Sequence, residues 1–427
     1  MRIACHTLGC KVNQYDTQAM LECFERAGYM HTPFQEEADV YLVNTCTVTG
    51  TGDKKSLQLI RRIHRLHPEA GIIVAGCLAQ RDARRVLLPG VRLVVGVRRR
   101  GEVVSLYERA LAENRPVCAV EQGGTWSFEP LRVGRHEGKT RATLKIQEGC
   151  DRYCAYCIIP YVRGPVRSMA PEAVESEARR LAEAGYPEIV LTGIHLGSYG
   201  RGTERGLLDA VERVQNIPGV KRIRLGSLEP PTVTEEWVHR LLTLDKVCPQ
   251  FHLSMQSGSA GVLRRMRRQY DPKGYLKAAR LLQNAYEHCA ITTDVLTAFP
   301  GETEEEALET EAFLGEVGFA RIHVFPYSRR AGTLADKMPG QLSQEVKQER
   351  TARLIAIGNQ LERAFVQKLV GSCQEVLFES ETSEGLWEGY TPQYVRVRAR
   401  GRAGQIARVC LEQAQGTLLL GSICEEE

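Results

Sequence analysis

Three cysteines of this sequence stand in a spacing that can bind a metal cluster. Cys150, Cys154 and Cys157, the loop trio, are separated by three residues and then by two. A single loop with this spacing can surround one face of an iron–sulfur cube, because each thiolate takes one iron. The fourth iron then has no cysteine, and an open metal position is where a small ligand can be activated. The alternatives are a zinc site that lacks one ligand or reduced cysteines without metal, although zinc sites usually pair cysteines as two separate C-x-x-C hooks.

Three further cysteines each follow a predicted strand. Cys10, Cys46 and Cys77, the N-terminal trio, come after strands predicted at residues 2–7, 39–43 and 71–75. The carboxyl ends of parallel strands meet at one edge of an open α/β sheet, where such folds bind ligands. We therefore expect these thiols to converge on a second cluster with three cysteine ligands. Alternatively, each is a small buried hydrophobic residue, as free cysteines usually are.

The elements that position the N-terminal trio alternate between strand and helix. Helices are predicted at 13–27 and 51–66, and a fourth strand at 92–95. This is the βαβ rhythm of a parallel sheet covered by helices, so residues 1–118 are expected to form an N-terminal α/β domain. Residues 119–140 contain several glycines and lack apolar periodicity, which predicts a linker.

The segments around these cysteines resemble those of a known family. LGCKVNQYDT, NTCTVT and AGCLAQR, followed by the CxxxCxxC loop with Tyr156 before its third cysteine, are similar to the methylthiotransferase family of radical S-adenosylmethionine (SAM) enzymes. Within that family, LGCKVNQYDT resembles the branch that acts on N6-threonylcarbamoyladenosine in transfer RNA. The isopentenyladenosine and ribosomal-protein branches tend to carry YGCQMN-like and LGCPKN-like starts instead.

The resemblance implies two 4Fe-4S clusters and SAM as cofactors. The cluster on Cys150, Cys154 and Cys157 would give one electron to SAM, and the resulting 5′-deoxyadenosyl radical would remove a hydrogen from C2 of an adenine next to the anticodon. The cluster on the N-terminal trio would carry the sulfur, methylated by a second SAM, that joins this carbon. The implied partners are the anticodon stem-loop of a transfer RNA and an electron donor such as flavodoxin or ferredoxin, with no DNA and no membrane.

After the linker, the alternation of strands and helices resumes. Strands are predicted at 143–147, 188–192, 222–225, 251–255, 291–296 and 321–325. Six such units fall short of the eight of a closed TIM barrel. The resemblance likewise implies a partial (βα)6 barrel, which we place at residues 141–365.

Polar residues follow several of these strands. Gly193 follows the second, Ser227 and Glu229 the third, and Gln256 the fourth. Each alone is an ordinary loop residue, but together they favour a pocket that faces the loop trio. The resemblance implies that these four residues and Tyr156 bind SAM. The arginines of the run 263–268 are either a solvated helix face or a contact for the RNA backbone.

The rhythm changes after a long helix predicted at 343–370. Short strands at 373–378, 394–399, 406–411 and 417–420, with glycines between them, predict a small β-barrel in residues 366–427. Its position resembles the OB-like TRAM domain, which holds RNA; an inert β cap is the alternative. Arg396, Arg398 and Arg400 should share one strand face. The loop trio is expected to lie between the N-terminal trio and this β module.

Length, composition and net charge limit the class of protein that this sequence can form. At 427 residues, with 43% hydrophobic and 25% charged residues, the chain is expected to be a cytoplasmic α/β protein of several domains. A net charge of +4 is too small to indicate nucleic-acid binding without local patches. Three other functions stay open: a methylthiotransferase of isopentenyladenosine in transfer RNA, a methylthiotransferase of a ribosomal-protein side chain, and a non-catalytic iron–sulfur RNA-binding protein.

Overall fold

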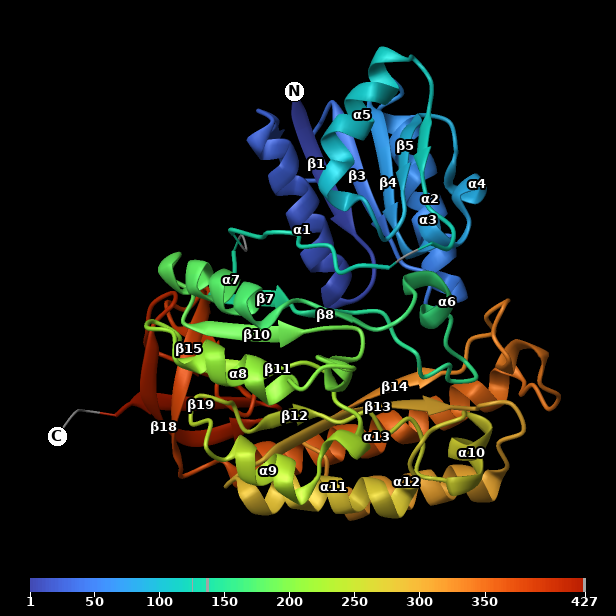
Figure 1. Cartoon of the computed structure of the whole chain (residues 1–427). Helices are drawn as coiled ribbons and strands as arrows, with labels where there is room; N and C mark the ends of the chain where they lie inside the picture. Colours follow the sequence, from blue (N-terminus) through green and yellow to red (C-terminus); the bar gives the residue numbers. More distant parts are fainter. Residues whose placement is uncertain (125, 136–137, 425–427) are drawn as a thin grey trace.

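A six-stranded parallel sheet forms the N-terminal part of the computed structural model, which describes residues 1–124, 126–135 and 138–424. Its strand order is β2-β1-β3-β4-β5-β6 (Figure 1). The strands are β1 (Arg2–Thr7), β2 (Met30–His31), β3 (Val40–Thr45), β4 (Gly71–Gly76), β5 (Val91–Val95) and β6 (Val117–Ala119). The predicted open sheet is confirmed, with β2 and β6 as additional short edge strands. The predicted linker 119–140 includes residues 125, 136 and 137, which lie outside the described residues.

Helices cover both faces of this sheet. They are α1 (Lys11–Arg26), α2 (Gly50–Leu66), α3 (Cys77–Arg81), α4 (Ala83–Val86), the 3₁₀ turn η1 (Arg100–Glu102) and α5 (Val103–Ala112). Phe24 of α1 and Tyr107 of α5 belong to the core on one face, and Ile60 of α2 and Leu78 of α3 to the core on the other. The central strands β3 and β4 are buried along their whole length, as expected of a parallel sheet between two helical layers.

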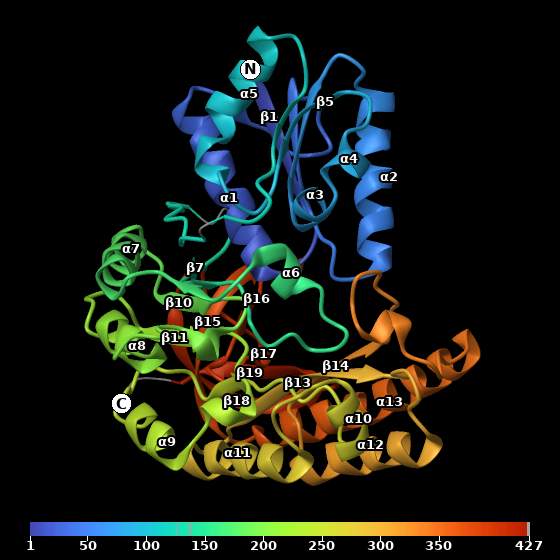
Figure 2. The ribbon, with the colours of Figure 1, turned by 45° about the vertical axis from the view of Figure 1, so that its right-hand side comes forward.

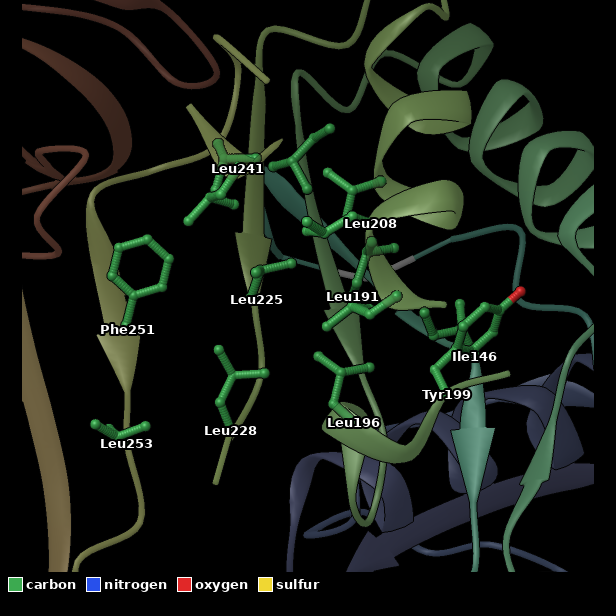
Figure 3. Packing of buried hydrophobic residues seen from close by; sticks show 14 of the residues in the cluster. Ile146, Leu191, Leu196, Tyr199, Leu208, Leu225, Leu228, Leu241, Phe251 and Leu253 are labelled. Carbon is green, nitrogen blue, oxygen red and sulfur yellow. The ribbon is translucent and has the colours of Figure 1, made fainter. Parts of the chain in front are cut away.

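Six parallel strands form the centre of the molecule. They are β7 (Arg141–Lys145), β10 (Glu188–Thr192), β11 (Arg222–Leu225), β12 (Gln250–His252), β13 (Ala290–Thr297) and β14 (Arg321–Pro326). The ladders β11-β10-β7 and β12-β13-β14 are joined through the bridge between Leu228 and Leu253. The predicted partial barrel is thereby confirmed. Leu191, Leu225 and Phe251, on three neighbouring strands, belong to the apolar core between these strands and the helices that cover them (Figure 3).

The helices of the partial barrel lie on its outer side (Figures 1 and 2). They are α7 (Pro171–Glu183), α8 (Leu207–Gln215), α9 (Glu235–Leu241), α10 (Ala260–Arg265), α11 (Pro272–Ala285), α12 (Glu304–Val317) and α13 (Gln344–Lys368). Shorter elements are β8 (Gln147–Glu148), α6 (Ile159–Arg163), β9 (Arg167–Ser168), η2 (Leu196–Ser198), η3 (Pro230–Thr232) and η4 (Ala335–Lys337). None of the helices in the described part of the chain combines the length and the apolar character that crossing a bilayer requires.

The C-terminal strands close into a barrel in the order β15-β16-β17-β19-β18. They are β15 (Cys373–Glu381), β16 (Trp387–Tyr390), β17 (Arg396–Ala399), β18 (Ile406–Gln415) and β19 (Leu418–Ile423). Val376, Phe378 and Leu419 fill its interior. The predicted small β-barrel is confirmed, although β16 was not predicted. Arg396 and Arg398 alternate with buried residues on β17, as expected.

This C-terminal barrel packs against the amino ends of the central strands. Arg141, the first residue of β7, lies 5.1 Å from the ring centre of Tyr390 and 4.7 Å from that of Tyr394. Arg224 of β11 donates to the carbonyl oxygen of Pro392 at 2.9 Å. The loop trio lies at the opposite, carboxyl ends, so the strands of the partial barrel separate it from the β module. Its expected place between the N-terminal trio and this module stays a prediction.

Candidate active site

The loop trio occupies a tightly constrained turn after β8. Gly149 has φ +76°, and a Cβ there would lie 1.8 Å from the carbonyl oxygen of Pro165, so only glycine fits. Cys150 N donates to the carbonyl oxygen of Gly164 at 3.0 Å, and Cys157 N to that of Cys154 at 2.9 Å. The first contact fixes the start of the loop, and the second folds its end into a turn.

The middle of the loop is held from the far side of the partial barrel. Ala155 N donates to the carbonyl oxygen of Met266, just after α10, at 2.9 Å. Ala335 N, in η4, donates to the carbonyl oxygen of Ala155 at 2.8 Å. The ring of Tyr156 meets Phe299 edge to face, with ring centres 6.4 Å apart. The loop therefore connects the first strand of the partial barrel with the segments that follow its fourth and sixth strands.

The structure brings the N-terminal trio together at the carboxyl edge of the sheet. Cys10 caps α1, Cys46 follows β3, and Cys77 begins α3. A Cβ on Gly9 would lie 3.1 Å from Cys46 Sγ, which shows how closely the first two loops approach. Burial raises the pKa of Cys77 to about 11, and the nearby Cys10 and Cys46 add to this rise, whereas Arg163 opposes it.

Neither the loop trio nor the N-terminal trio holds all three sulfurs as close together as a single metal ion requires. Zinc bound to thiolates at about 2.3 Å needs sulfurs about 3.8 Å apart. In the described part of the chain, only Cys373, Cys410 and Cys424 bring three candidate ligand atoms within 4.8 Å of one another. In each of the other two trios, at least one pair of sulfurs therefore lies farther apart than this. An iron–sulfur cube accommodates wider spacing, because each cysteine binds a different iron.

A buried arginine connects the two trios. Arg163, at the end of α6, donates from Nε to Cys77 Sγ at 3.3 Å and from Nη1 to Glu148 Oε1 at 2.6 Å. Glu148 precedes the loop trio by two residues and also pairs with Arg100 at 3.0 Å and Lys145 at 3.5 Å. Burial opposes the ionisation of Glu148, but Arg100, Lys145 and Arg163 outweigh it and lower its pKa well below the usual range.

Asp16 of α1 completes this buried ion network. Its carboxylate lies 2.5 Å from Lys145 Nζ and 3.5 Å from Arg163 Nη2, and it also pairs with Arg100. The network joins the N-terminal sheet to the first strand of the partial barrel. Sequence reasoning missed these residues, because no local spacing marks charges that pair across more than a hundred positions.

A second cationic centre lies beside Cys154. Arg268 donates from Nη1 to Cys154 Sγ at 3.1 Å and pairs with Glu229 at 2.7 Å. Glu229 also lies 2.8 Å from His195 Nε2 and 2.9 Å from Arg152 Nε. Burial disfavours the charged carboxylate, but its contacts with His195, Arg268 and Arg152 outweigh this cost and lower the pKa of Glu229 to about 2.

The other residues predicted to bind SAM take different positions on the same rim. A Cβ on Gly193 would lie 2.6 Å from Gln147 Oε1, so this glycine makes room for a protein side chain. That amide oxygen accepts from His195 N at 2.7 Å. Gln256 has φ +68° and its backbone bridges to β13, whereas Ser227 is exposed.

The arginine run 263–268 is not one continuous RNA-facing surface. Arg265 pairs with Glu306 at 2.5 Å, and Arg268 is buried beside Cys154. Arg268 is neither on a solvated helix face nor directed outward to an RNA backbone, because the chain reverses after α10. Arg267 has φ +59° at this point. The side chain of Arg268 is directed inward as a result.

Comparisons with known proteins agree with this geometry. Residues 2–96 match the uncharacterized protein family UPF0004, and residues 144–314 match the radical SAM superfamily. The chain is 42% identical to threonylcarbamoyladenosine tRNA methylthiotransferase MtaB of Bacillus subtilis, over 95% of this chain and 92% of that protein. The protein of the same description from Aquifex aeolicus is 34% identical, over 96% and 100% of the two chains.

Two further comparisons involve a protein named for a different substrate and a solved structure with the same fold. A tRNA-2-methylthio-N(6)-dimethylallyladenosine synthase of Pelotomaculum thermopropionicum is 35% identical over 88% of this chain and 86% of that protein. The radical SAM methyltransferase TsrM of Kitasatospora setae, solved with cobalamin and a 4Fe-4S cluster, shares the fold with a TM-score of 0.58 at 14% identity. That alignment covers 91% of this chain and 80% of TsrM. The chain therefore belongs to the radical SAM methylthiotransferase family.

Proposed function

We propose that this enzyme adds a methylthio group to C2 of N6-threonylcarbamoyladenosine next to the anticodon of transfer RNA. The observation that carries the proposal is the pairing of two three-cysteine sites across the buried Arg163, which contacts Cys77 directly and reaches the loop trio through Glu148. One such site suits a radical SAM reaction, whereas insertion of sulfur requires a second. The resemblance of LGCKVNQYDT and the 42% identical relative favour the threonylcarbamoyl substrate.

The loop trio and the N-terminal trio would each hold one 4Fe-4S cluster with three cysteines. When bound, the clusters supply the electron that cleaves SAM and the site that carries the transferred sulfur. The protein itself contributes positive charge next to the thiolates: Arg163 at Cys77 and Arg268 at Cys154. Hydrogen bonds to cluster sulfurs and nearby charges set the reduction potential of such sites.

The rim around Glu229 would bind SAM, together with Tyr156, Gly193, Ser227 and Gln256. Glu229 stays ionised at neutral pH, since its pKa is about 2. Its carboxylate can therefore accept from a cationic amino group, and Arg152 and Arg268 can pair with a carboxylate. The exposed Ser227 adds a hydroxyl at the open side of the rim.

The partner would be the anticodon stem-loop of a transfer RNA in the cytoplasm. An unpaired loop base is easier to present to the two trios than a base within a duplex. The C-terminal barrel, as a TRAM-like module, would hold the RNA backbone through exposed arginines such as Arg396 and Arg400. A flavodoxin or ferredoxin would supply electrons.

Nucleoside mass spectrometry of transfer RNA from cells with and without this gene tests the proposal. We expect 2-methylthio-N6-threonylcarbamoyladenosine to disappear when the gene is deleted and to return with the intact gene. Loss of the dimethylallyl derivative instead would support the activity named for the 35% identical relative. Unchanged RNA together with a methylthiolated protein side chain would overturn an RNA substrate, and absence of SAM cleavage would leave an iron–sulfur RNA-binding protein.

A further inference from the structure

A third group of cysteines lies on the C-terminal barrel, far along the chain from the other two trios. Cys373, Cys410 and Cys424, the barrel trio, place their sulfur atoms within 4.8 Å of one another. Cys373 Sγ lies 2.8 Å from Cys410 Sγ. Cys373 is exposed and the other two are half-buried, so an ion can reach the group from solvent.

Strand pairing creates this convergence. Cys373 of β15 faces Cys410 of β18 in the register of the two antiparallel strands. The neighbouring pair is hydrogen-bonded, because Leu411 N donates to the carbonyl oxygen of Ser372 at 2.9 Å. Bonded and non-bonded pairs alternate along an antiparallel ladder, so Cys373 and Cys410 form a non-hydrogen-bonded pair, in which side chains approach most closely.

The third cysteine comes from the other neighbour of β18. Ser422 of β19 faces Cys410, and Cys424 follows two residues later on the same side. Cys424 N donates to the carbonyl oxygen of Arg408 at 2.9 Å, which continues the pairing past the end of β19. Two adjacent strands and the residue that follows a third therefore each contribute one thiol on the outer side of the barrel, whereas Val376, Val409 and Leu419 point into its core.

The chemistry of the barrel trio suits a soft cation. Thiolates are the form of cysteine that binds such ions, and binding of the ion releases the thiol protons. The positive charge of the ion would also offset the repulsion between neighbouring thiolates.

We propose that Cys373, Cys410 and Cys424 form a binding site for a thiophilic metal ion such as Zn²⁺, separate from both cluster sites. Sulfurs about 3.8 Å apart suit tetrahedral zinc with bonds of about 2.3 Å. Cys373 Sγ and Cys410 Sγ, 2.8 Å apart, would have to separate to reach this value, and all three sulfurs already lie within 4.8 Å of one another. A disulfide would use two thiols and would leave the third without a role. The bound ion would link β15, β18 and the residue that follows β19, with water in the fourth position.

The test is zinc analysis of the full-length enzyme, purified without oxygen with both clusters loaded, from medium supplemented with zinc. The variants are the triple Cys373→Ser/Cys410→Ser/Cys424→Ser and the single Cys424→Ser. Cys118→Ser, at an exposed cysteine of β6 in the N-terminal sheet, is the matched control. We expect about one zinc per chain in the wild type and the control, with zinc-edge X-ray absorption showing about three sulfurs at about 2.3 Å.

The triple variant should lose this zinc while its iron content and SAM cleavage stay unchanged, which separates the barrel trio from the cluster sites. Cys424→Ser, outside the strands, should retain zinc less well during gel filtration even if the triple variant folds poorly. Equal zinc in wild type and variants, or a zinc signal without sulfur ligands, would overturn the proposal. So would a Cys373–Cys410 disulfide, without zinc, in the anaerobically purified enzyme. These outcomes do not depend on which RNA is modified.

Discussion

Arg163 Nε donates to Cys77 Sγ at 3.3 Å, although the two residues lie 86 positions apart and belong to different parts of the fold. The same guanidinium reaches Glu148, two residues before the loop trio. Because Arg163 is almost completely buried, its charge is poorly screened by solvent. It is therefore placed to influence both trios.

The Arg163→Lys variant should lower the reduction potential of a cluster on the N-terminal trio. Lysine keeps the charge but loses the planar fork that contacts Cys77 and Glu148 together, and hydrogen bonds to cluster sulfurs raise the potential. An EPR-monitored redox titration, in a background without the loop trio, measures the shift. Arg179→Lys, which alters a surface pair with Glu175 on α7, is the control and should leave the potential unchanged. An unchanged potential in Arg163→Lys would argue against Cys77 as a ligand.

Iron content distinguishes one cluster from two. Anaerobically reconstituted enzyme should contain about eight irons per chain, and about four after alanine replacement of either the N-terminal trio or the loop trio. Cys118→Ser should retain all of the iron. A wild-type value near four that does not fall when Cys10, Cys46 and Cys77 are replaced would contradict the second cluster.

The Gly149→Ala variant should lose the iron held by the loop trio. Alanine at φ +76° costs about 1–2 kcal/mol in any setting. Its Cβ would also lie 1.8 Å from the Pro165 carbonyl oxygen, and this clash moves Cys150. Gly185→Ala is the matched control, since that glycine has φ +92° but open space around it. If Gly185→Ala lost as much iron as Gly149→Ala, the loss would come from backbone strain in general and not from the clash with Pro165.

The Glu229→Gln variant should destabilise the protein in a pH-dependent way. The pKa of Glu229 falls from 4.5 to about 2 on folding, a shift that corresponds to about 3 kcal/mol at neutral pH. Because the folded pKa is the lower one, this stabilisation is complete above pH 4.5 and is lost as the pH falls towards 2. Urea unfolding of the cluster-free chain measures it as the difference between wild type and variant.

Glu235→Gln provides the control for that measurement. Glu235 is exposed and forms a surface ion pair with Lys277, so its replacement should leave the unfolding free energy nearly unchanged at every pH. If the Glu229→Gln difference stayed constant from pH 7 to pH 3, a loss of packing rather than of ion pairing would be responsible.

Replacement of both Arg396 and Arg400 by alanine should weaken RNA binding while SAM cleavage without RNA stays the same. Each lost phosphate contact reduces the slope of log Kd against log salt concentration by about one. Binding of transfer RNA at several salt concentrations measures this slope. Arg109→Ala, at an exposed arginine of α5, should leave the slope unaltered. An unaltered slope in the double variant would favour the inert-cap interpretation.

The sequence predicted the elements whose patterns are local. The strand at Glu188–Thr192 was predicted with its observed bounds, because an apolar run there is bounded by Pro187 and Gly193. The short strands Met30–His31 and Trp387–Tyr390 were missed, since a run of two to four residues without alternation resembles a loop. Pairing with a neighbouring strand, rather than their own residues, defines them.

In the candidate site, too, only the residues with a local sequence pattern were predicted. Spacing identified the cysteines, but Arg163 and Arg268 come close to Cys77 and Cys154 only after folding. Gly193 was correctly singled out as a place of close approach. However, its neighbour in the structure is Gln147, a residue that carries no motif. Such pairs are tertiary contacts that a single sequence does not display.

The C-terminal barrel and the loop trio lie at opposite ends of strands such as β10, which is five residues long and so about 17 Å from end to end. An RNA gripped by the barrel must therefore extend past the full height of these strands before one of its bases reaches the thiols. The separation of the two sites would then set the distance between the bound RNA backbone and the base that is modified. If the barrel binds the RNA as proposed, a free nucleoside or a short oligonucleotide would not reach both points, and binding would depend on the size and shape of a whole hairpin.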